Sequence, residues 1–340
     1  MIALSDQVCR RLVGYMTAPR PQRTSLSVAQ IFGLHPIRQR LAEAVLALRG
    51  QEEIPPARWG LSSVKVLKPW ISFPTWLGRT RRDRRIPIYN FFNRTQTPPE
   101  QGWSTRVTQV QDFRGGSLTY DSHNGTDFAI PTGTTVTAPA DGRVMLLPNE
   151  FNRGGLKVMI DHGHGVVTSC NHLGASLVEV GQLVRRGEPI ALSGYSGLDG
   201  FLLFPWTAPH VHFNVFLDGE NIDPFAAPGG LEESMWLGGG DPLPASGEDD
   251  SAYEPTRWDK PALAETIAAC GNQQVRQHLE LIDDTDQLAA ELLYQTAYYP
   301  TRFSERRRLY EEQHERAPLL SLPFSGDDFV GVHYRKSDRS

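Results

Sequence analysis

Hydrophobic and polar residues alternate in short runs through the middle of the chain. Residues 135–138 and 157–160 show this alternation, and Gly, Pro, Asp or Asn interrupts it about every ten residues. A period of two places one set of side chains on each face of a strand, and turn residues at this spacing join neighbouring strands. The pattern predicts a mainly β domain of antiparallel sheets over residues 106–230.

The residues before this domain follow a different pattern. Between Pro36 and Gly50, apolar residues recur at helical spacing, which predicts one amphipathic helix with Ile37, Leu41, Val45 and Leu48 on one face. Residues 54–105 mix Pro, Trp and Arg without a period, so we expect an irregular arm whose aromatic side chains are buried against the β domain. Five arginines between positions 79 and 85 indicate a solvated turn in preference to a contact with a polyanion. We therefore assign residues 1–105 to an irregular or helical N-terminal arm.

The residues after the β domain are rich in turn formers and then in helix formers. Residues 231–255 contain three successive glycines and an acidic run, which is typical of a linker. Beyond them, apolar residues repeat at helical spacing at Leu263 and Ile267, at Val275, Leu279 and Ile282, and at Leu288 and Leu292. The highly charged segment 302–316 also has a helix-like composition. We expect an α-helical C-terminal region over residues 256–340.

Charge and hydropathy exclude several classes of partner. The 340 residues carry 34 Lys and Arg against 39 Asp and Glu, a net charge of -5, so nothing in the charge balance favours nucleic acid or an anionic membrane. No apolar run approaches the ~20 residues of a membrane-spanning helix. Asp6, Arg10 and Arg11 interrupt the first residues, which therefore lack the pattern of a secretion signal. These features predict a protein without a membrane span, cytoplasmic by sequence.

Histidine is concentrated in the β domain. Six of the ten histidines lie within one window, at positions 123, 162, 164, 172, 210 and 212. The three cysteines, Cys9, Cys170 and Cys270, lie far apart, which argues against a disulfide framework and a Cys-rich zinc module. A metal in this chain must therefore use His and carboxylate ligands, and such a set suits Zn²⁺.

Two His-x-His pairs compete for the role of a ligand pair. His162 and His164 lie among glycines after Asp161, and we interpret them as turn residues. His210 and His212 instead begin an apolar run with strand character, where period two places both side chains on one face. The second pair is therefore the better candidate.

A third ligand must come from elsewhere in the chain. His123 and Asp127 lie four residues apart around Gly125, and a glycine there lets the chain curl so that both side chains face one metal. Asp and Asn beside Gly are also ordinary turn formers, so the spacing gains its force from the surrounding motifs.

Residues 120–225 resemble the catalytic domain of the M23 family of zinc metallopeptidases, the lysostaphin-type and LytM-type endopeptidases that cut peptide bridges in bacterial peptidoglycan. Four ordered blocks carry the resemblance. They are the H-x-x-x-D box at His123 and Asp127, the I-x-H-G and H-L pair at 160–163 and 172–173, the G-x-x-V-x-x-G-x-x-I pattern at 181–190, and the closing H-x-H-F-x-V at 210–215, followed by Asp223 and Pro224.

The resemblance implies roles for five residues. His123, Asp127 and His212 would bind one Zn²⁺ per chain, and His172 and His210 would be the catalytic histidines that assist proton transfer. It also implies a zinc-dependent metalloendopeptidase that hydrolyses peptidoglycan cross-links or stem peptides, in a family that typically acts in the cell envelope or outside the cell.

Three departures from the family pattern keep other interpretations open. Cys170 stands where the family usually has Tyr, which affects rate or substrate preference, unless Cys170 is simply a small buried strand residue. An apolar run at 201–206 precedes the closing motif, either as a wall of the substrate cleft or as a segment covered by the flanks. The third departure is the missing export signal.

The alternatives are a non-catalytic or regulatory binding protein of the same fold and a peptidase for a substrate other than peptidoglycan. We also expect both flanks to cover or restrict the catalytic domain.

Overall fold

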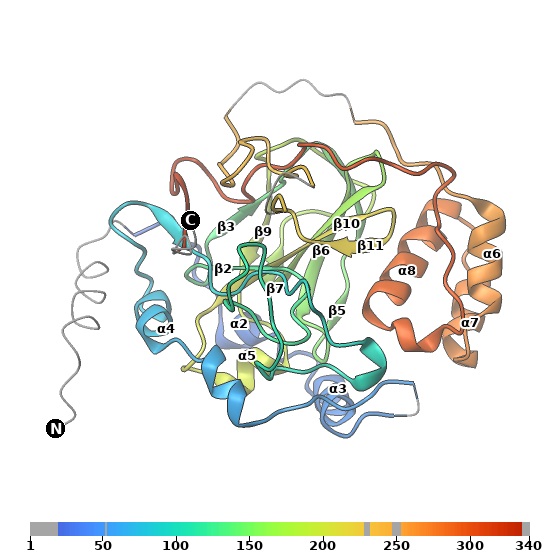
Figure 1. The fold of residues 1–340 in the computed structure, drawn as a ribbon, viewed down its shortest axis with the longest axis horizontal. Coiled ribbons are helices and arrows are strands. Elements are labelled where there is room, and N and C mark those ends of the chain that lie inside the picture. The colour runs from blue at the N-terminus through green and yellow to red at the C-terminus, as the bar shows by residue number, and fades with distance from the viewer. Residues whose placement is uncertain (1–19, 52, 228–231, 247–252, 335–340) are drawn as a thin grey trace.

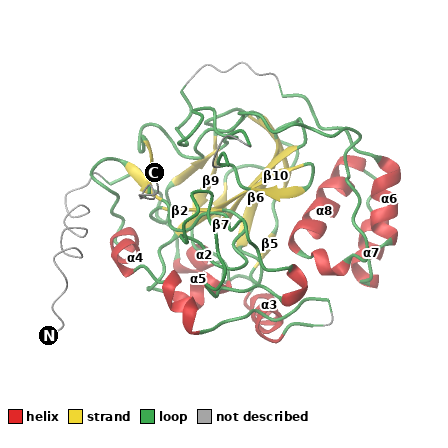
Figure 2. Cartoon of the chain, viewed as in Figure 1, coloured by secondary structure: helices red, strands yellow, loops and turns green. Residues whose placement is uncertain are grey.

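The computed structural model describes residues 20–334, apart from residue 52 and the ranges 228–231 and 247–252. Strands form the centre of the molecule, short N-terminal helices lie at one edge and a group of three C-terminal helices lies at another (Figure 1). Loops make up much of the chain between these elements (Figure 2). Among the described residues, none of the helices has the length and apolar character needed to span a lipid bilayer.

Ten strands within the described part of the chain form one antiparallel sheet, as the alternating pattern predicts. Its main path is β11 (Glu220–Ile222), β10 (His210–Leu217), β7 (Val166–Ser176), β6 (Gly155–Asp161), β4 (Gly142–Leu146) and β8 (Leu183–Val184). The other strands join this path: β2 (Thr126–Ala129) pairs with β10, β5 (Asn149–Glu150) with β6, and β9 (Pro189–Ser193) with both β7 and β3 (Thr135–Thr137). The mainly β fold class is therefore confirmed.

The two faces of the sheet carry different side chains. In β10, Val211, Phe213 and Val215 are fully buried in the main hydrophobic core, whereas the intervening His210, His212 and Asn214 face the other way. Strand alternation thus gives one apolar face that holds the sheet in place and one polar face that is available for chemistry.

The N-terminal arm contains helices and packs against the sheet. Its helices are α2 (Val28–Phe32), α3 (Ile37–Arg49) and α4 (Pro69–Trp76), with a 3₁₀ turn η1 (Leu61–Val66) and a short strand β1 (Arg85–Pro87). The expectation of irregular chain is wrong at α4, which begins at Pro69, where a proline lacks only an N–H that a helix start leaves unpaired. Ile86, Ile88 and Phe91 of the arm lie in the main core.

The C-terminal helices α6 (Lys260–Ala268), α7 (Gln273–Glu280) and α8 (Thr285–Tyr298) confirm the predicted helical region. Leu292 and Leu293 of α8 share a second buried cluster with Val167 and Phe216 of the sheet. This cluster attaches the helices to the β domain.

The predicted helix over residues 302–316 is wrong. Only a 3₁₀ turn, η3 (Pro300–Arg302), occurs at its start, and the rest forms no helix. The segment has too few apolar residues for a helical stripe, and it buries Phe303, Leu309 and Tyr310 while most of its charged residues stay exposed. Charge alone does not specify a helix.

The last described residues return to the β domain. Leu320, Leu322 and Phe324 lie in the main core, and β12 (Gly331–His333) pairs in parallel with β1 of the arm. Arg84 and Arg85, part of the predicted solvated turn, donate hydrogen bonds to backbone carbonyls of this returning segment. Met235 and Trp236, from the interval predicted as a linker, are also buried in the core. The division of the chain at 105, 230 and 255 stays a prediction.

Candidate metal and catalytic site

Strand pairing brings the predicted ligands together. In β10, His212 lies opposite Asp127 of β2 on one side and opposite Asn171 of β7 on the other. Residues directly opposite each other in an antiparallel pair share one face of the sheet. The pairing register of β10 with β2 alone therefore places Asp127, from the H-x-x-x-D box, beside the polar face of β10.

His123 reaches the same point from the loop before β2. Gly125 allows this approach, because a Cβ atom there would lie 2.7 Å from Nε2 of His212 and 2.7 Å from the Phe213 carbonyl oxygen. Position 125 therefore needs a glycine because β10 lies too close for any side chain, whether or not the chain also curls there. The predicted role of Gly125 in joining His123 and Asp127 thus has a steric basis.

Three ligand atoms gather at one point. Asp127 Oδ1 lies 2.8 Å from Nδ1 of His212 and 3.0 Å from Nε2 of His123, and the two imidazole nitrogens are 3.2 Å apart. Tetrahedral coordination at Zn–N distances of 2.0–2.1 Å separates ligand atoms by roughly 3.3–3.4 Å. The donor set and its spacing therefore fit a tetrahedral metal ion with one position left open.

Each ligand is oriented through its other polar atom. His123 Nδ1 lies 2.5 Å from the Phe91 carbonyl oxygen, which fixes the proton on that nitrogen and leaves Nε2 as the donor to a metal. His212 Nε2 lies 3.1 Å from Oδ1 of Asn124, which leaves Nδ1 for the metal. Such second contacts set the tautomer and the angle of each ring.

The candidate carboxylate ligand, Asp127, is oriented by the N-terminal arm. Asn90 Nδ2 donates a hydrogen bond of 2.7 Å to Oδ2 of Asp127, and Lys68 Nζ donates one of 2.8 Å to Oδ1 of Asn90. Burial lowers the pKa of the Lys68 ammonium to about 7. Sequence reasoning missed Asn90 and Lys68, because neither has a spacing motif and only their aromatic neighbours marked this stretch as buried.

The two remaining predicted histidines lie beside the ligand cluster. His210 Nδ1 lies 2.8 Å from the Ala208 carbonyl oxygen, and His172 Nδ1 lies 2.8 Å from the Ser196 carbonyl oxygen. In both rings these bonds leave Nε2 unprotonated in the neutral state. The ring centres of His172 and His210 are 4.9 Å apart. Two proton acceptors therefore lie together next to the ligands.

Electrostatics favour the protonation states that a metal site needs. Burial raises the pKa of Asp127, but attraction to His123 and His210, together with hydrogen bonds from His123 and His212, outweighs burial and holds the pKa well below its usual value. Burial lowers the pKa of His212 to about 4, and it also lowers the pKa of His210. Near neutral pH, Asp127 is therefore a carboxylate and His212 and His210 are neutral imidazoles.

The competing His-x-His pair lies outside the cluster. His164 adopts a φ of 51° in the turn between β6 and β7. His162 directly follows β6, where it is buried and bonds to the Asp141 carbonyl oxygen and to Thr168 Oγ1. Burial lowers the pKa of His162 to about 4. Neither residue belongs to the gathered ligands.

Cys170 points away from the site. It lies opposite Phe213 in the register of β7 and β10 and is buried in the main core. Burial raises the pKa of its thiol to about 12, so the thiol stays protonated and unreactive. The interpretation of Cys170 as a small buried strand residue fits this position.

The pocket over the site is narrow and has walls from both flanks. Its volume is about 110 Å³, and its lining includes His172 and His212, Trp59 of the arm, Tyr298 at the end of α8, and Asp199. Residues 201–206 do not line it. They follow the start of helix α5 (Leu198–Leu203), and the rings of Phe201, Phe204 and Trp206 contact the aromatic side chains Phe32, Phe73 and Trp76 of the arm. The arm contacts this run without covering it, because Phe201, Phe204 and Trp206 are 52%, 49% and 53% exposed. The run is therefore neither a wall of this pocket nor a segment buried under the arm.

The sheet thus brings two imidazoles and a carboxylate close enough together to hold a metal ion, with two more imidazoles beside them. Residues 121–224 match Peptidase family M23, so the chain contains an M23 peptidase domain. An uncharacterized metalloprotease of Haemophilus influenzae is 40% identical over 102 residues, which cover 30% of this chain and 20% of that protein. The peptidoglycan DD-endopeptidase ShyA of Vibrio cholerae is 39% identical over 105 residues, which cover 31% of this chain and 23% of that protein.

Among solved structures, a zinc-containing peptidase from Vibrio cholerae is 28% identical, with a TM-score of 0.28, over 43% of this chain and 40% of that chain. The chain spans about a fifth to a quarter of the length of the curated relatives it matches. The likeness to these relatives is therefore a likeness of the M23 domain.

Proposed function

We propose that this protein is a zinc-dependent metalloendopeptidase that hydrolyses peptide bonds of peptidoglycan, with one Zn²⁺ per chain. The observation that carries the proposal is the gathering of His123 Nε2, Asp127 Oδ1 and His212 Nδ1 within 3.2 Å of one another. The relative named as a peptidoglycan DD-endopeptidase supports the choice of substrate.

Zn²⁺ held by these three residues would supply a Lewis acid for the scissile carbonyl and lower the pKa of a water molecule to about 7. The chain's own residues then handle the proton. His210 presents a free Nε2 toward the site, 3.6 Å from Asp127 Oδ1, and its lowered pKa keeps it ready to accept a proton near neutral pH. His172 presents a second Nε2, which lies 3.6 Å from Oδ2 of Asp199, and its ring centre lies 4.9 Å from that of His210.

The two histidines divide the proton transfers of hydrolysis. One takes a proton from the attacking water, and one gives a proton to the leaving amine. Carbonyl contacts from Ala208 and Ser196 hold both rings so that Nε2, and not Nδ1, faces the substrate. The burial of all five side chains excludes bulk water, which strengthens these electrostatic interactions.

A direct test uses the full chain with its zinc content measured by mass spectrometry. Wild-type protein should contain one zinc and release soluble peptides with new amino and carboxyl ends from purified peptidoglycan. Chelation should stop release, and added zinc should restore it. A non-catalytic binding protein would bind peptidoglycan without release, and a peptidase for another substrate would cleave a random peptide library but not peptidoglycan. Either result would contradict the proposal.

A further inference from the structure

A second, larger cavity lies directly beside the metal pocket. Its volume is about 590 Å³, which is in the usual range for ligand sites. The two spaces share the lining residues Trp103, Asn124, Arg153 and Tyr298. Because Asn124 also contacts the ligand His212, the large cavity begins next to the metal site.

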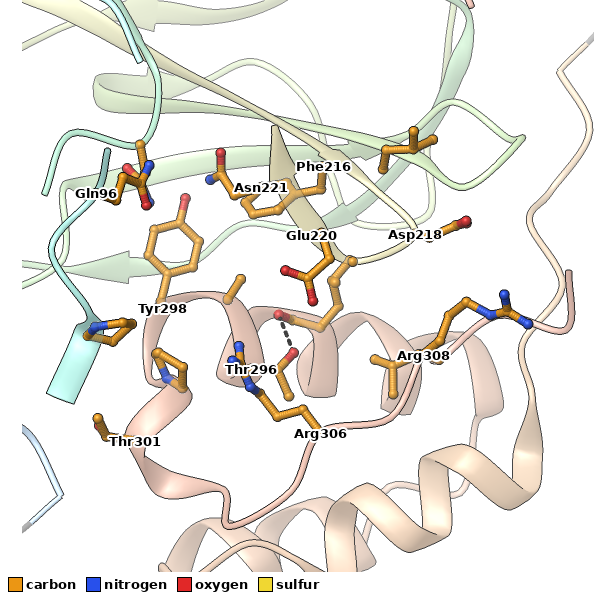
Figure 3. Close-up of a pocket in the computed structure, with 18 of the residues that line it drawn as sticks. Gln96, Phe216, Asp218, Glu220, Asn221, Thr296, Tyr298, Thr301, Arg306 and Arg308 are labelled. Atoms are coloured by element: carbon orange, nitrogen blue, oxygen red, sulfur yellow. Dashed lines mark hydrogen bonds between the residues drawn. The ribbon is translucent and has the colours of Figure 1, made fainter. Parts of the chain in front are cut away.

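The C-terminal region builds much of this cavity. One wall is the end of β10, the following turn and β11, and the opposite wall is the end of α8 together with chain from 300 to 314 (Figure 3). The C-terminal wall lies outside residues 121–224, which match the M23 family. The cavity is therefore a property of this chain and not of the family domain alone.

Asn221 brings unsatisfied hydrogen-bonding groups to the cavity. Its side-chain Oδ1 and Nδ2 are both buried and have no partner within the part of the chain that the structure describes. The residue lines the cavity and lies beside Tyr298 in the view of Figure 3. A buried amide without partners costs free energy unless a bound molecule satisfies it. Asn221 thus provides one donor and one acceptor for a ligand.

Charge in the cavity is mainly positive. The guanidinium groups of Arg153, Arg306 and Arg308 contact no carboxylate among the described residues. Among the acidic residues that line the cavity, Glu220 alone forms no ion pair within the described part of the chain. The other charged lining residues are already paired: Arg307 with Glu265 and Glu305, and His314 with Asp218. Arg153 also donates hydrogen bonds to the backbone carbonyls of Tyr298 and Asn152. The excess of guanidinium groups without a carboxylate partner suits a ligand that carries a carboxylate.

We propose that this cavity is a substrate subsite that binds a free carboxylate of the peptide extending from the scissile bond, with Arg306 as the main cation and Asn221 as a hydrogen-bonding partner. The proposal rests on the peptidase function proposed above. The narrow metal pocket accepts little more than the scissile bond, while the neighbouring cavity has room for several residues on one side of it. Selectivity therefore comes from the C-terminal region.

The test measures binding separately from turnover. The probe is a soluble peptidoglycan fragment, used in its native form and after its carboxylates have been converted to amides. Its dissociation constant is measured by calorimetry with the full zinc-loaded chain carrying His210→Ala, so that hydrolysis is slowed. Arg306→Gln, Asn221→Leu and Arg276→Gln are each added to this background. Arg276 lies on α7 and lines neither cavity, which makes it the matched control.

Arg306→Gln should weaken binding of the native fragment about tenfold and change binding of the amidated fragment less than twofold, because a charge-assisted hydrogen bond is lost. Asn221→Leu should weaken binding about fivefold while leaving the melting temperature unchanged or higher, since it removes an unsatisfied buried amide. Arg276→Gln should leave the dissociation constant unchanged. Weaker binding without loss of stability identifies Asn221 as a ligand contact and not a structural residue.

Equal affinity for native and amidated fragments would overturn the proposal, as would Arg306 and Asn221 variants that bind the native fragment as tightly as the background protein. Absence of binding of the native fragment would overturn it too. The peptidase function is judged independently, from hydrolysis by the wild-type chain. Arg306-dependent binding without any hydrolysis would reject that function and keep the carboxylate site.

Discussion

Asn90 and Asp127 are joined by a hydrogen bond of 2.7 Å from Nδ2 of the amide to Oδ2 of the carboxylate. Asn90 belongs to the N-terminal arm, and Asp127 belongs to the M23 domain. The bond leaves Oδ1 of Asp127 free to face His123 and His212. A residue outside the family domain thus sets which carboxylate oxygen is available to a metal.

Replacing Asn90 by Ala should weaken zinc binding. Without its donor, Asp127 loses the contact that orients the carboxylate, and contacts of this kind are worth roughly 10–100-fold in metal affinity. Competition with a chromogenic chelator measures the effect. Asn149→Ala, at an exposed position on β5, is the control and should bind zinc like the wild type. Equal affinity in both variants would show that Asn90 does not orient the ligand.

Ligand and catalytic histidines should separate by metal content. His210→Ala and His172→Ala should each retain zinc but lose about 10²–10⁴-fold in rate, because each removes a positioned proton acceptor. His212→Ala should lose the zinc itself. Metal analysis and a hydrolysis assay on the same samples decide between these results. Equal zinc loss from the His210 and His212 variants would mean that their roles are exchanged.

Cys170 should take no part in the reaction. Its thiol is buried, and its pKa is raised to about 12 by burial. We expect iodoacetamide to leave Cys170 unmodified in the folded protein, as measured by peptide mass spectrometry, and Cys170→Ala to keep its rate within about twofold of the wild type. Rapid labelling of this peptide under native conditions would place the thiol at an accessible surface instead.

Lys157 should make stability depend on pH above neutrality. Burial lowers its pKa from 10.5 to about 8, with Glu150 acting in the opposite direction. Between these two values the unfolded chain binds more protons than the folded chain, so the free energy of unfolding rises with pH across this window. Relative to Lys157→Met, the wild type should gain about 3 kcal/mol from pH 8 to pH 10.5. Denaturant titrations of both proteins at a series of pH values measure this rise in the free energy of unfolding. A difference between the two proteins that does not change with pH would show that the Lys157 ammonium is freely solvated.

The isolated range 106–230 should fold poorly. It lacks Phe91 from the arm and Trp236 and Phe324 from the C-terminal side, all of which are buried in the main core. It also lacks Asn90. We expect a much lower melting temperature, or aggregation, and weaker zinc binding than in the full chain. An isolated domain with the stability and activity of the full chain would show that neither flank packs on it in a consequential way.

The sequence predicts the polar face of β10 well because strand geometry is local. His210 and His212 must share a face whenever the segment is a strand, and the family motifs locate His123 and Asp127. The contacts of Asn90 and Tyr298 are long-range, and no periodicity indicates which distant residue fills a given space. The Tyr298 hydroxyl, for example, lies 3.2 Å from Nδ2 of Asn171 and 3.2 Å from Oδ1 of Asn214.

Helix α3 shows a second limit of pattern reasoning. The spacing of its apolar residues predicts the helix correctly, but Leu41 and Val45 are 63% and 50% exposed, and the buried side chains are Arg40 and Ala47. Arg40 is buried because Glu43 pairs with it at 2.6 Å and the Asn149 carbonyl accepts a hydrogen bond from it. Amphipathic spacing predicts that the segment is helical. The part of the protein that packs against the helix decides which of its faces is buried.

The parallel pairing of β1 with β12 has a consequence for the order of events during protein synthesis. Asn90 follows β1 closely, and β1 obtains its partner strand only when residues 331–333 have left the ribosome. His123, Asp127 and His212 emerge much earlier. A nascent chain can therefore display all three side chains while the segment that orients Asp127 still lacks its neighbour. The proposed metal site would thus be completed late in translation.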